Sequence, residues 1–381
     1  MTRDSVSVRS GTGGTRSEPV SVTDELAVAV LGVGNIGSVH LQSVEAFEGA
    51  SVVAAADAVA ENRAKALELG ADNVYGEYQE LLGAETVDVA IIALPPSLHR
   101  VAAESAMERG CDVFVEKPFA RTVAEARSIE STAERIGRTV GVDHTLRYQD
   151  GVRAVKKAYD RGELGHVPLC TLRRVNHGPF ASPPDEASVS EWQLDPQLTG
   201  GGALLDLGVH LFDVLEWTVG ECELVDASVE STLDLPYEDV ACVQLRAVER
   251  DTIATVQCGF FQWEDPPEVN CSVRFEGIVD SIESADHTPE HFPLYAAKSA
   301  ATNLARSLLG GEPNYLEPTY YYRAHYRALT EFLAALRTGR PAPVDARDGV
   351  RTIELVEAAY EAAEPDYREE EPPTPTIGET S

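Results

Sequence analysis

Apolar runs and segments with helical spacing alternate along the first 145 residues. The apolar runs are residues 26–31, 52–56, 87–94, 112–115 and 139–142, with a short extended segment at 73–75. Continuous apolar runs of this length are typical of strands that are buried on both faces. Helical spacing follows the first run and recurs at 58–69, 98–109 and 123–136. This alternation predicts a parallel, doubly wound sheet.

The pattern changes in the second part of the chain. Extended runs at 224–233, 240–248, 252–261 and 269–275 follow one another with few helical signals between them. Short connections between strands favour an antiparallel sheet. Further helices are expected at 151–161, 200–220, 319–337 and 346–363, an extended segment at 167–175, and an irregular segment at 180–198. We therefore predict an α/β protein whose C-terminal α+β domain contains a large open, mostly antiparallel sheet.

A glycine motif follows the first apolar run. Gly32, Gly34 and Gly37 fit the pattern G-x-G-x-x-G between a predicted strand and a predicted helix. Gly32 permits a tight turn, Gly34 lets the backbone approach a pyrophosphate, and Gly37 lets the helix lie against the strand. The unpaired N–H groups near Asn35 and Ile36 favour a bound anion. The motif in this context predicts a Rossmann domain that binds a dinucleotide, and a glycine turn in another α/β fold is the alternative.

The second apolar run ends at Asp57, which stands 20 residues after Gly37. Its carboxylate can accept hydrogen bonds from the adenosine ribose hydroxyls and would repel a 2′-phosphate, so NAD is favoured over NADP. Arg63 follows closely and leaves the use of NADP open. We expect a disordered arm at 1–24, an NAD(P)-binding domain at 25–146, a substrate-binding and oligomerisation domain at 147–363, and an acidic tail at 364–381.

The charge of the chain indicates the salt conditions to which the protein is adapted. The sequence has 63 acidic and 31 basic residues, a formal net charge of −32, and the acids are spread along its whole length. Self-repulsion opposes compact folding at low salt, and molar salt, with a Debye length of about 3 Å, screens it. We interpret this as halophilic adaptation, with an ordinary acidic protein as the alternative. Binding to nucleic acid or to an anionic membrane is not expected.

The sequence predicts a cytoplasmic protein. No apolar run reaches transmembrane length, and the first residues lack the apolar core of a secretory signal. The six cysteines are scattered without a Cys-x-x-Cys pair, which is typical of free thiols in a reducing compartment.

Ligands of a doubly wound sheet bind beyond the carboxyl ends of its strands. Two turns fall there in addition to Asp57: Leu94-Pro95-Pro96-Ser97-Leu98-His99 and Glu116-Lys117-Pro118. Lys117 is one of only five lysines in the chain. On position alone, a surface lysine that follows a strand is an equally good interpretation.

A polar stripe marks the predicted helix that contains residues 204–217. The segment is apolar nearly all round except for Asp206, His210 and Asp213, whose spacings of four and three put them on one face. Buried polar groups need partners or line a cavity. A histidine four residues from an aspartate suits a base that a carboxylate orients, and a satisfied core pair is the alternative. A metal site is not expected, because no third ligand with clear spacing stands out.

Together these motifs resemble the glucose–fructose oxidoreductase, inositol dehydrogenase and rhizopine-catabolism (Gfo/Idh/MocA) family. The matching segments are GVGNIG at 32–37, LPPSLH at 94–99, EKPFA at 116–120, RGELGHV at 161–167 and GGGALLDLGVHLFD at 200–213. The likeness extends from about residue 26 to residue 337. It implies an N-terminal Rossmann domain and a C-terminal domain whose sheet forms a homodimer or homotetramer interface.

The resemblance implies catalytic roles for Lys117, Asp206 and His210, with a Lys117–Pro118 bond that is often cis in relatives. The residues expected to contact the cofactor are Gly32, Gly34, Asn35, Ile36, Gly37, Asp57, Leu94, Pro95, His99, Glu116 and Lys117. Those expected to contact the substrate are Lys117, Arg147, Trp192, Asp206 and His210. The role of His144 stays open. Gln193 stands where many relatives have arginine, so the contact that the arginine makes in those relatives is not predicted for this chain.

These roles predict hydride transfer between the nicotinamide and a carbinol carbon of a sugar or cyclic polyol. His210 would take the hydroxyl proton, Asp206 would hold the imidazole, and Lys117 would stabilise the developing alkoxide. Two alternatives stay open: a glycoside hydrolase that uses NAD only transiently, and a non-catalytic, cofactor-bound sugar sensor. Net NADH production would separate the first alternative, and the joint presence of the three residues argues against the second.

Overall fold

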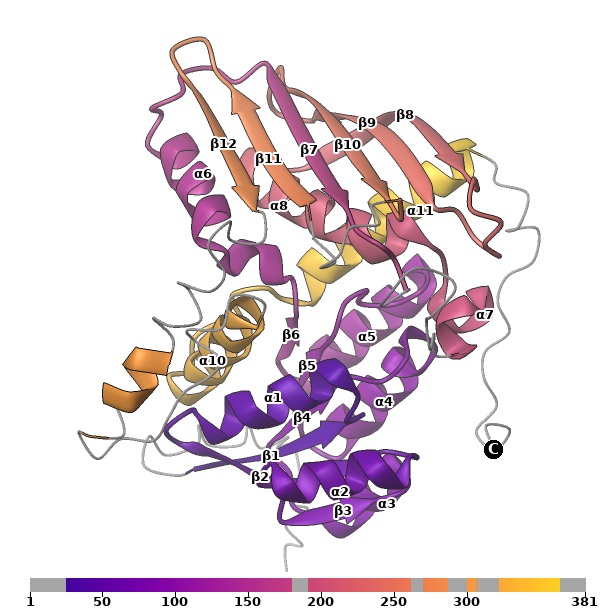
Figure 1. Ribbon diagram of the computed structural model, residues 1–381, viewed down its shortest axis with the longest axis vertical. Helices are drawn as coiled ribbons and strands as arrows, with labels where there is room; N and C mark the ends of the chain where they lie inside the picture. The colour runs from indigo at the N-terminus through magenta and orange to yellow at the C-terminus, as the bar shows by residue number, and fades with distance from the viewer. Residues whose placement is uncertain are drawn as a thin grey trace, which may run out of the picture.

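The computed structural model describes residues 25–179, 191–261, 270–286, 300–305, 308 and 322–363. The arm expected at 1–24, the tail expected at 364–381 and most of the irregular segment expected at 180–198 lie outside these ranges. Two six-stranded sheets, each with helices packed against it, form the two halves of the molecule (Figure 1). The predicted fold class is confirmed.

The N-terminal sheet is parallel and has the strand order β3-β2-β1-β4-β5-β6. Its strands are β1 (Leu26–Leu31), β2 (Ala50–Ala56), β3 (Asn73–Tyr75), β4 (Val89–Ile92), β5 (Asp112–Val115) and β6 (Val140–Val142). The central strands β1 and β4 are almost entirely buried, as their apolar runs predict. The order reverses between β1 and β4, and a ligand binds at the carboxyl ends of the strands beside such a reversal.

Five helices connect these strands. They are α1 (Asn35–Glu45), α2 (Ala60–Glu68), α3 (Tyr78–Ala84), α4 (Pro96–Glu108) and α5 (Val123–Ile136). The sequence analysis did not predict α3, whose seven residues are too few to show a helical period. Helix α5 has the predicted bounds because both ends carry local signals. The Thr122 side chain caps its first turn, and Gly137 ends it in the left-handed conformation, with φ of 73°.

The C-terminal sheet has the order β12-β11-β7-β10-β9-β8. Its strands are β7 (Leu169–Val175), β8 (Cys222–Glu230), β9 (Val240–Ala247), β10 (Ile253–Gly259), β11 (Asn270–Glu276) and β12 (Ser281–Asp286). All neighbours pair antiparallel except β7 and β10, which are parallel. Helices α6 (Asp150–Asp160), α8 (Val209–Val219) and α11 (Ala346–Ala363) lie on one face of this sheet (Figure 1).

The predicted helix at 200–220 is two segments of different geometry. The π-helix η3 (Leu204–Gly208) leads directly into α8. Helical structure from Pro196 to Val219 is long and apolar enough to cross a membrane, which corrects the prediction that no run reaches that length. However, 83% of the apolar stretch in this segment is buried inside the fold, which is typical of a core helix.

Short elements connect the two sheets. They are the 3₁₀-helices η1 (Thr145–Tyr148) and η2 (Glu191–Leu194), the single turn α7 (Pro196–Thr199) and the helix α10 (Arg323–Arg337). Although α10 comes late in the sequence, it packs against α1 of the N-terminal half. The carboxyl ends of the parallel strands therefore meet residues from the C-terminal part of the chain.

Candidate active site

The glycine turn after β1 has the geometry that a dinucleotide requires. Gly32 has φ of +92°, and a Cβ there would lie 2.4 Å from the Ala93 oxygen. A Cβ on Gly37 would lie 1.9 Å from the Gly32 oxygen. Both positions therefore need glycine for packing. Gly34 differs, because a Cβ there would meet nothing within 4 Å. The protein leaves open space in front of Gly34, as the close approach of a pyrophosphate requires.

The start of α1 also fits an anion. Gly34 is the N-cap of the helix, and no side chain caps its first turn, which begins at Asn35 and Ile36. The first N–H groups of a helix need an acceptor, and a phosphate oxygen supplies one. The residues present therefore fit the pyrophosphate of a dinucleotide.

Asp57 lies directly after β2 and faces the glycine turn. Its Oδ2 accepts hydrogen bonds from the Val33 amide at 2.7 Å and the Asn62 side chain at 3.1 Å, and its Oδ1 accepts from the Val59 amide at 2.8 Å. The Arg63 guanidinium donates to the Asp57 main-chain oxygen at 2.7 Å. A carboxylate and a guanidinium thus both stand where the ribose of the adenosine half is expected.

Lys117 joins the two halves of the molecule. The Lys117–Pro118 bond is cis, as predicted. The Lys117 Nζ lies 2.5 Å from Oδ1 of Asp206, which comes from η3 on the C-terminal side. The two side chains are 23% and 41% exposed, so a substrate can reach them.

His99 holds the two turns that surround Lys117. Its ring is buried, and its Nδ1 and Nε2 lie 2.9 Å and 2.8 Å from the main-chain oxygens of Pro118 and Leu94. Burial lowers the pKa of His99, and the two carbonyls partly offset that effect. Leu94 and Pro95 are half-buried at the carboxyl end of β4. We propose that His99 serves the cofactor site by fixing these turns rather than by direct contact.

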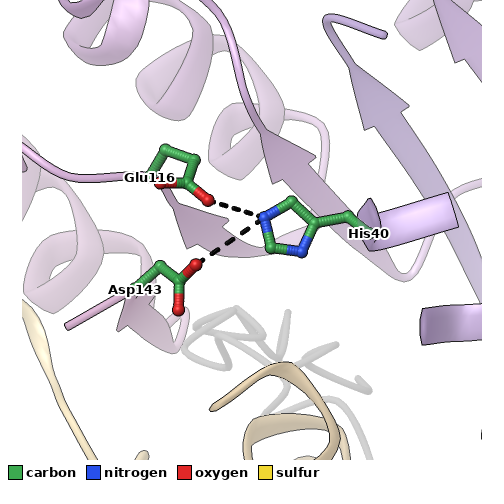
Figure 2. Close-up of side chains that lie close together, drawn as sticks. All are labelled: His40, Glu116 and Asp143. Atoms are coloured by element: carbon green, nitrogen blue, oxygen red, sulfur yellow. Dashed lines mark hydrogen bonds and ion pairs between the residues drawn. The ribbon is translucent and has the colours of Figure 1, made fainter. Parts of the chain in front are cut away.

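A buried polar network includes Glu116, the residue before Lys117 (Figure 2). The His40 Nε2 is 2.7 Å from Glu116 Oε1 and 3.8 Å from Asp143 Oδ2, and the His325 Nδ1 is 2.8 Å from the same Asp143 oxygen. Burial raises the pKa of Asp143, and the charge of Glu116 raises it further. The hydrogen bond and charge of His40 outweigh burial at Glu116 and lower its pKa. Of this carboxyl pair, Asp143 is therefore the first to take up a proton as the pH falls.

The same network contains donor types that bind metals. Within the described ranges, His40, Glu116 and Asp143 form one group whose ligand atoms all lie within 4.8 Å of one another. The 2.7 Å contact between His40 and Glu116 has the length of a hydrogen bond. Two ligands on one tetrahedral zinc ion would lie roughly 3.3 Å apart. His40 and Glu116 therefore form a hydrogen bond with each other rather than a pair spaced for a metal ion. The expectation of no metal stays a prediction.

His210 lies beside a second imidazole, that of His144. The two rings meet edge-on with centroids 6.2 Å apart, and both side chains are buried. His210 Nδ1 and both ring nitrogens of His144 have no hydrogen-bond partner in the described part of the chain. Polar atoms that are buried without partners are rare in native proteins and are typical of sites that await a ligand or water.

The expectation that Asp206 orients His210 is not supported. Asp206 Oδ1 contacts Lys117, and the described structure contains no hydrogen bond between Asp206 and His210. The reason lies in the helix: Asp206 is in the π-helical turn η3, whose wider turn does not bring residues four apart into line. The carboxylate therefore positions the lysine.

The environment of His210 keeps its imidazole unprotonated. Burial lowers its pKa well below 6.5, and the positive charges of Arg174 and Lys117 lower it further. The imidazole is therefore neutral at neutral pH, the state that a general base requires. The charge of Lys117 therefore reaches His210, although one residue belongs to the loop after β5 and the other to α8.

Two family models cover most of the described chain. Residues 26–144 match an oxidoreductase family with an NAD-binding Rossmann fold, and residues 152–277 match the GFO/IDH/MocA C-terminal domain. The chain belongs to the Gfo/Idh/MocA oxidoreductase family. It is an NAD(P)-dependent oxidoreductase, and the predicted resemblance and cofactor are confirmed.

Curated relatives and solved structures of this Gfo/Idh/MocA chain cover nearly its whole length. D-apiose dehydrogenase of Paraburkholderia graminis is 26% identical over 343 residues, which are 88% of this chain and 87% of the relative. D-xylose 1-dehydrogenase (NADP(+)) 2 of Haloferax volcanii is 26% identical over 338 residues, 88% of this chain and 96% of the relative. The structure of GenD2 from gentamicin A biosynthesis in complex with NAD has a TM-score of 0.73 at 21% identity, covering 92% of this chain and 97% of that one. Likeness at this identity shows the fold.

Arg147 is paired with two carboxylates in this Gfo/Idh/MocA chain. Its guanidinium is buried and donates to both Asp213 oxygens, at 2.8 Å and 2.6 Å, and it lies 3.1 Å from Asp348. Although burial disfavours its charge, the two carboxylates raise its pKa. Arg147 thus ties η1 to α8 and α11, and the expected substrate contact is not supported. This ion pair supplies the partner of Asp213, the third residue of the predicted polar stripe.

Trp192 stands at the surface of η2 with 37% of its side chain exposed. The next residue, Gln193, is anchored through its main-chain oxygen, which accepts a 2.7 Å hydrogen bond from the Tyr237 hydroxyl. An exposed indole offers a flat apolar surface to a sugar ring, so its predicted substrate contact stays open to test.

Sequence reasoning missed one residue and left another without a role. Arg174 is the missed residue, and its charge lowers the pKa of His210 more than the charge of Lys117 does. His144 is the residue left without a role, and its ring lies beside that of His210. A signal for Arg174 exists in the sequence: it alternates with Cys170 and Leu172 along β7, at a position where the period predicts an inward-facing residue. A charged residue in such a position marks a functional site more often than a core position.

Proposed function

We propose that this protein catalyses reversible hydride transfer between a nicotinamide cofactor and a carbinol carbon of a sugar or cyclic polyol. One observation carries the proposal. Lys117 and His210 come from different halves of the molecule, the charge of Lys117 acts on His210, and the 2.5 Å contact between Lys117 and Asp206 joins the two halves. The names of its relatives, D-apiose dehydrogenase and D-xylose 1-dehydrogenase, support this class of substrate.

The side chains divide the chemistry between them. When bound, the cofactor supplies or accepts the hydride. His210, neutral because it is buried, takes the proton of the substrate hydroxyl. Lys117 donates a hydrogen bond to the same oxygen and stabilises the alkoxide that develops there. Asp206 keeps the ammonium of Lys117 in place. In the reverse direction His210 returns the proton.

We infer that NAD is the preferred cofactor and that NADP binds more weakly. The Asp57 carboxylate, held against the glycine turn, would repel a 2′-phosphate. The Arg63 guanidinium donates only to main-chain oxygens in the described structure, those of Asp57 and Ala58, and keeps a positive charge nearby. Initial rates with each cofactor over a range of concentrations test this preference.

The variant His210→Ala tests the catalytic assignment. General base catalysis contributes roughly 10²–10⁴ in rate, so turnover should fall by that factor while NAD still binds. His166→Ala, which changes an exposed histidine, is the matched control and should alter neither property. The readout is NADH absorbance with pentoses, hexoses and inositols in molar salt. Unchanged turnover in His210→Ala would refute the assignment, and glycoside cleavage without net NADH would favour a redox-assisted hydrolase.

We further propose a halophilic, cytoplasmic homo-oligomer. The net charge of −32 and the relative from Haloferax volcanii support the first property. Among the described residues, α6, α8 and α11 lie on one face of the C-terminal sheet, and we propose that a second copy covers the opposite face (Figure 1). Light scattering in molar salt tests for a dimer or tetramer.

A further inference from the structure

Arg174 occupies an inward-facing position in the C-terminal sheet. Cys170 and Leu172 of β7 are fully buried on the helix-covered face, and the alternation of the strand puts Arg174 on that same face. Its partners across the sheet are Cys258 on β10 and Cys271 on β11, both buried. The guanidinium therefore extends from a layer of thiols and apolar side chains toward the helices.

This guanidinium has no acidic partner among the described residues. Its Nε and Nη1 are buried and lack any hydrogen-bond partner there. The other cations of the site differ: Lys117 is paired with Asp206, and Arg147 is paired with Asp213 and Asp348. A buried charge without a partner is costly, so a protein retains one where a ligand supplies the opposite charge.

The position of Arg174 connects it to the reacting groups. Of the charged groups that act on His210, Arg174 is the strongest, ahead of Lys117. Its charge also reaches His325, which lies behind Lys117. In a chain with a net charge of −32, this site thus contains one positive charge that no described carboxylate balances.

We propose that Arg174 binds a carboxylate of the substrate, so that the substrate is a sugar acid, such as a uronate or an aldonate, rather than a neutral sugar. This inference rests on the proposed function. A guanidinium fork matches the two oxygens of a carboxylate. One unbalanced positive charge matches one negative charge, whereas a phosphate dianion would leave an excess. The oxidised nicotinamide adds positive charge when bound, which also favours an anionic substrate.

The test measures binding and turnover separately. The probes are D-glucuronate with D-glucose, D-galacturonate with D-galactose, D-gluconate, and glucose 6-phosphate, at constant ionic strength. Calorimetry on the NAD-loaded protein gives affinities, and NADH absorbance gives kcat and KM. The variants are Arg174→Gln, Arg174→Lys to keep the charge, and Arg173→Gln as the matched control. Arg173 precedes Arg174 on β7 and points to the opposite face.

We expect the acids to bind better than their neutral partners. Loss of one side of a buried charge pair corresponds to about 30-fold or more in affinity, so Arg174→Gln should weaken uronate binding by that factor and glucose binding by less than about twofold. Arg174→Lys should fall between, and Arg173→Gln should match the wild type. In Arg174→Gln, the acid limb of the pH profile should also move to higher pH, because a positive charge near His210 is lost.

The outcomes distinguish this inference from the proposed function. Equal affinity for acids and neutral sugars, unaffected by Arg174→Gln, would overturn the carboxylate site while NADH formation from neutral sugars would keep the hydride transfer. Preference for glucose 6-phosphate would also overturn it. Binding of uronates that depends on Arg174, without NADH formation from any probe, would support the site and overturn the hydride transfer.

Discussion

At the scale of single residues, the polar side chains of the proposed site differ in whether other groups of the protein pair with them. Lys117 and Arg147 are cations bound by carboxylates, and His99 is fixed by two main-chain oxygens. His210 and Arg174 have no such partner among the described residues for the buried atoms Nδ1, Nε and Nη1. We assign His210 and Arg174 to the substrate on this ground, and Lys117 on the ground of its place beside Asp206 at the junction of the two halves.

The pH profile follows from the environment of His210. Burial, Arg174 and Lys117 lower its pKa below 6.5. Since the neutral ring is the base, kcat/KM for substrate oxidation should stay constant as the pH falls from neutrality to 6.5 and decline only below that. Reduction needs the protonated ring, so its rate should decrease as the pH rises through the same pKa. Profiles at constant ionic strength check this, and an oxidation limb above pH 7 in the wild type would contradict it.

Single residues also show where prediction from sequence stops. Lys117 and His210 could be predicted because each stands in a local motif beside a recognisable strand or helix. The pairing of Arg147 could not, because its partner Asp213 is 66 residues away and belongs to another element. The pairing of Asp206 with Lys117 was not predicted either, since a spacing of four implies an α-helix, whereas the chain forms a π-helical turn there.

At the scale of elements, hydrophobic period and end signals predicted most strands and helices. Strand β5 and helix α5 have the predicted bounds, since apolar runs and caps are local properties. Strand β12 was missed because its sequence SIESAD is polar and alternates weakly. It forms the edge strand of a hairpin with β11, from which only residues 277–280 separate it, and its own sequence carries little strand signal. The parallel pairing of β7 and β10 could not be predicted for another reason, because these strands lie far apart in the sequence.

The start of α1 gives a prediction for one element. Gly34 has φ of −67°, and a Cβ there meets nothing within 4 Å, so Gly34→Ala should fold with a loss of about 1 kcal/mol at most, the typical cost of alanine at an N-cap. The added methyl would occupy the space left for the pyrophosphate, and NAD affinity should fall about tenfold or more. Calorimetry and thermal unfolding measure the two effects.

The matched control for Gly34→Ala is Gly83→Ala. Gly83 lies in α3, and a Cβ there also meets nothing within 4 Å. Because α3 is not part of the proposed site, this variant should bind NAD as the wild type does, with equal or slightly higher stability. Wild-type NAD affinity in Gly34→Ala would show that the cofactor does not pass close to this turn.

At the scale of the whole molecule, the late part of the sequence completes the early domain. Helix α10 packs on α1, and the Arg337 side chain donates to the Glu48 oxygen at 2.9 Å. His325 of the same helix joins the buried network of Glu116 and Asp143 behind Lys117. Residues from both ends of the sequence therefore meet in this network. The domain boundaries predicted along the sequence do not describe that arrangement.

The net charge of −32 leads to a prediction for the entire fold. Two electrostatic effects oppose each other as salt is added. Screening weakens attractive pairs such as Arg327 with Asp150, whose atoms lie 2.6 Å apart, and it also weakens the repulsion among excess acids. Exposed pairs contribute little individually, so relief of the repulsion should dominate.

We therefore expect Tm to rise by at least about 5 °C, equivalent to about 2 kcal/mol, between 0.1 M and 1 M KCl, as the Debye length falls from about 10 Å to about 3 Å. Thermal unfolding followed by circular dichroism gives the curve. Sucrose at matched osmolality is the control, because it strengthens apolar burial without screening charge. A Tm that is flat or falls with KCl, or a gain that sucrose reproduces, would show that charge repulsion does not limit this fold.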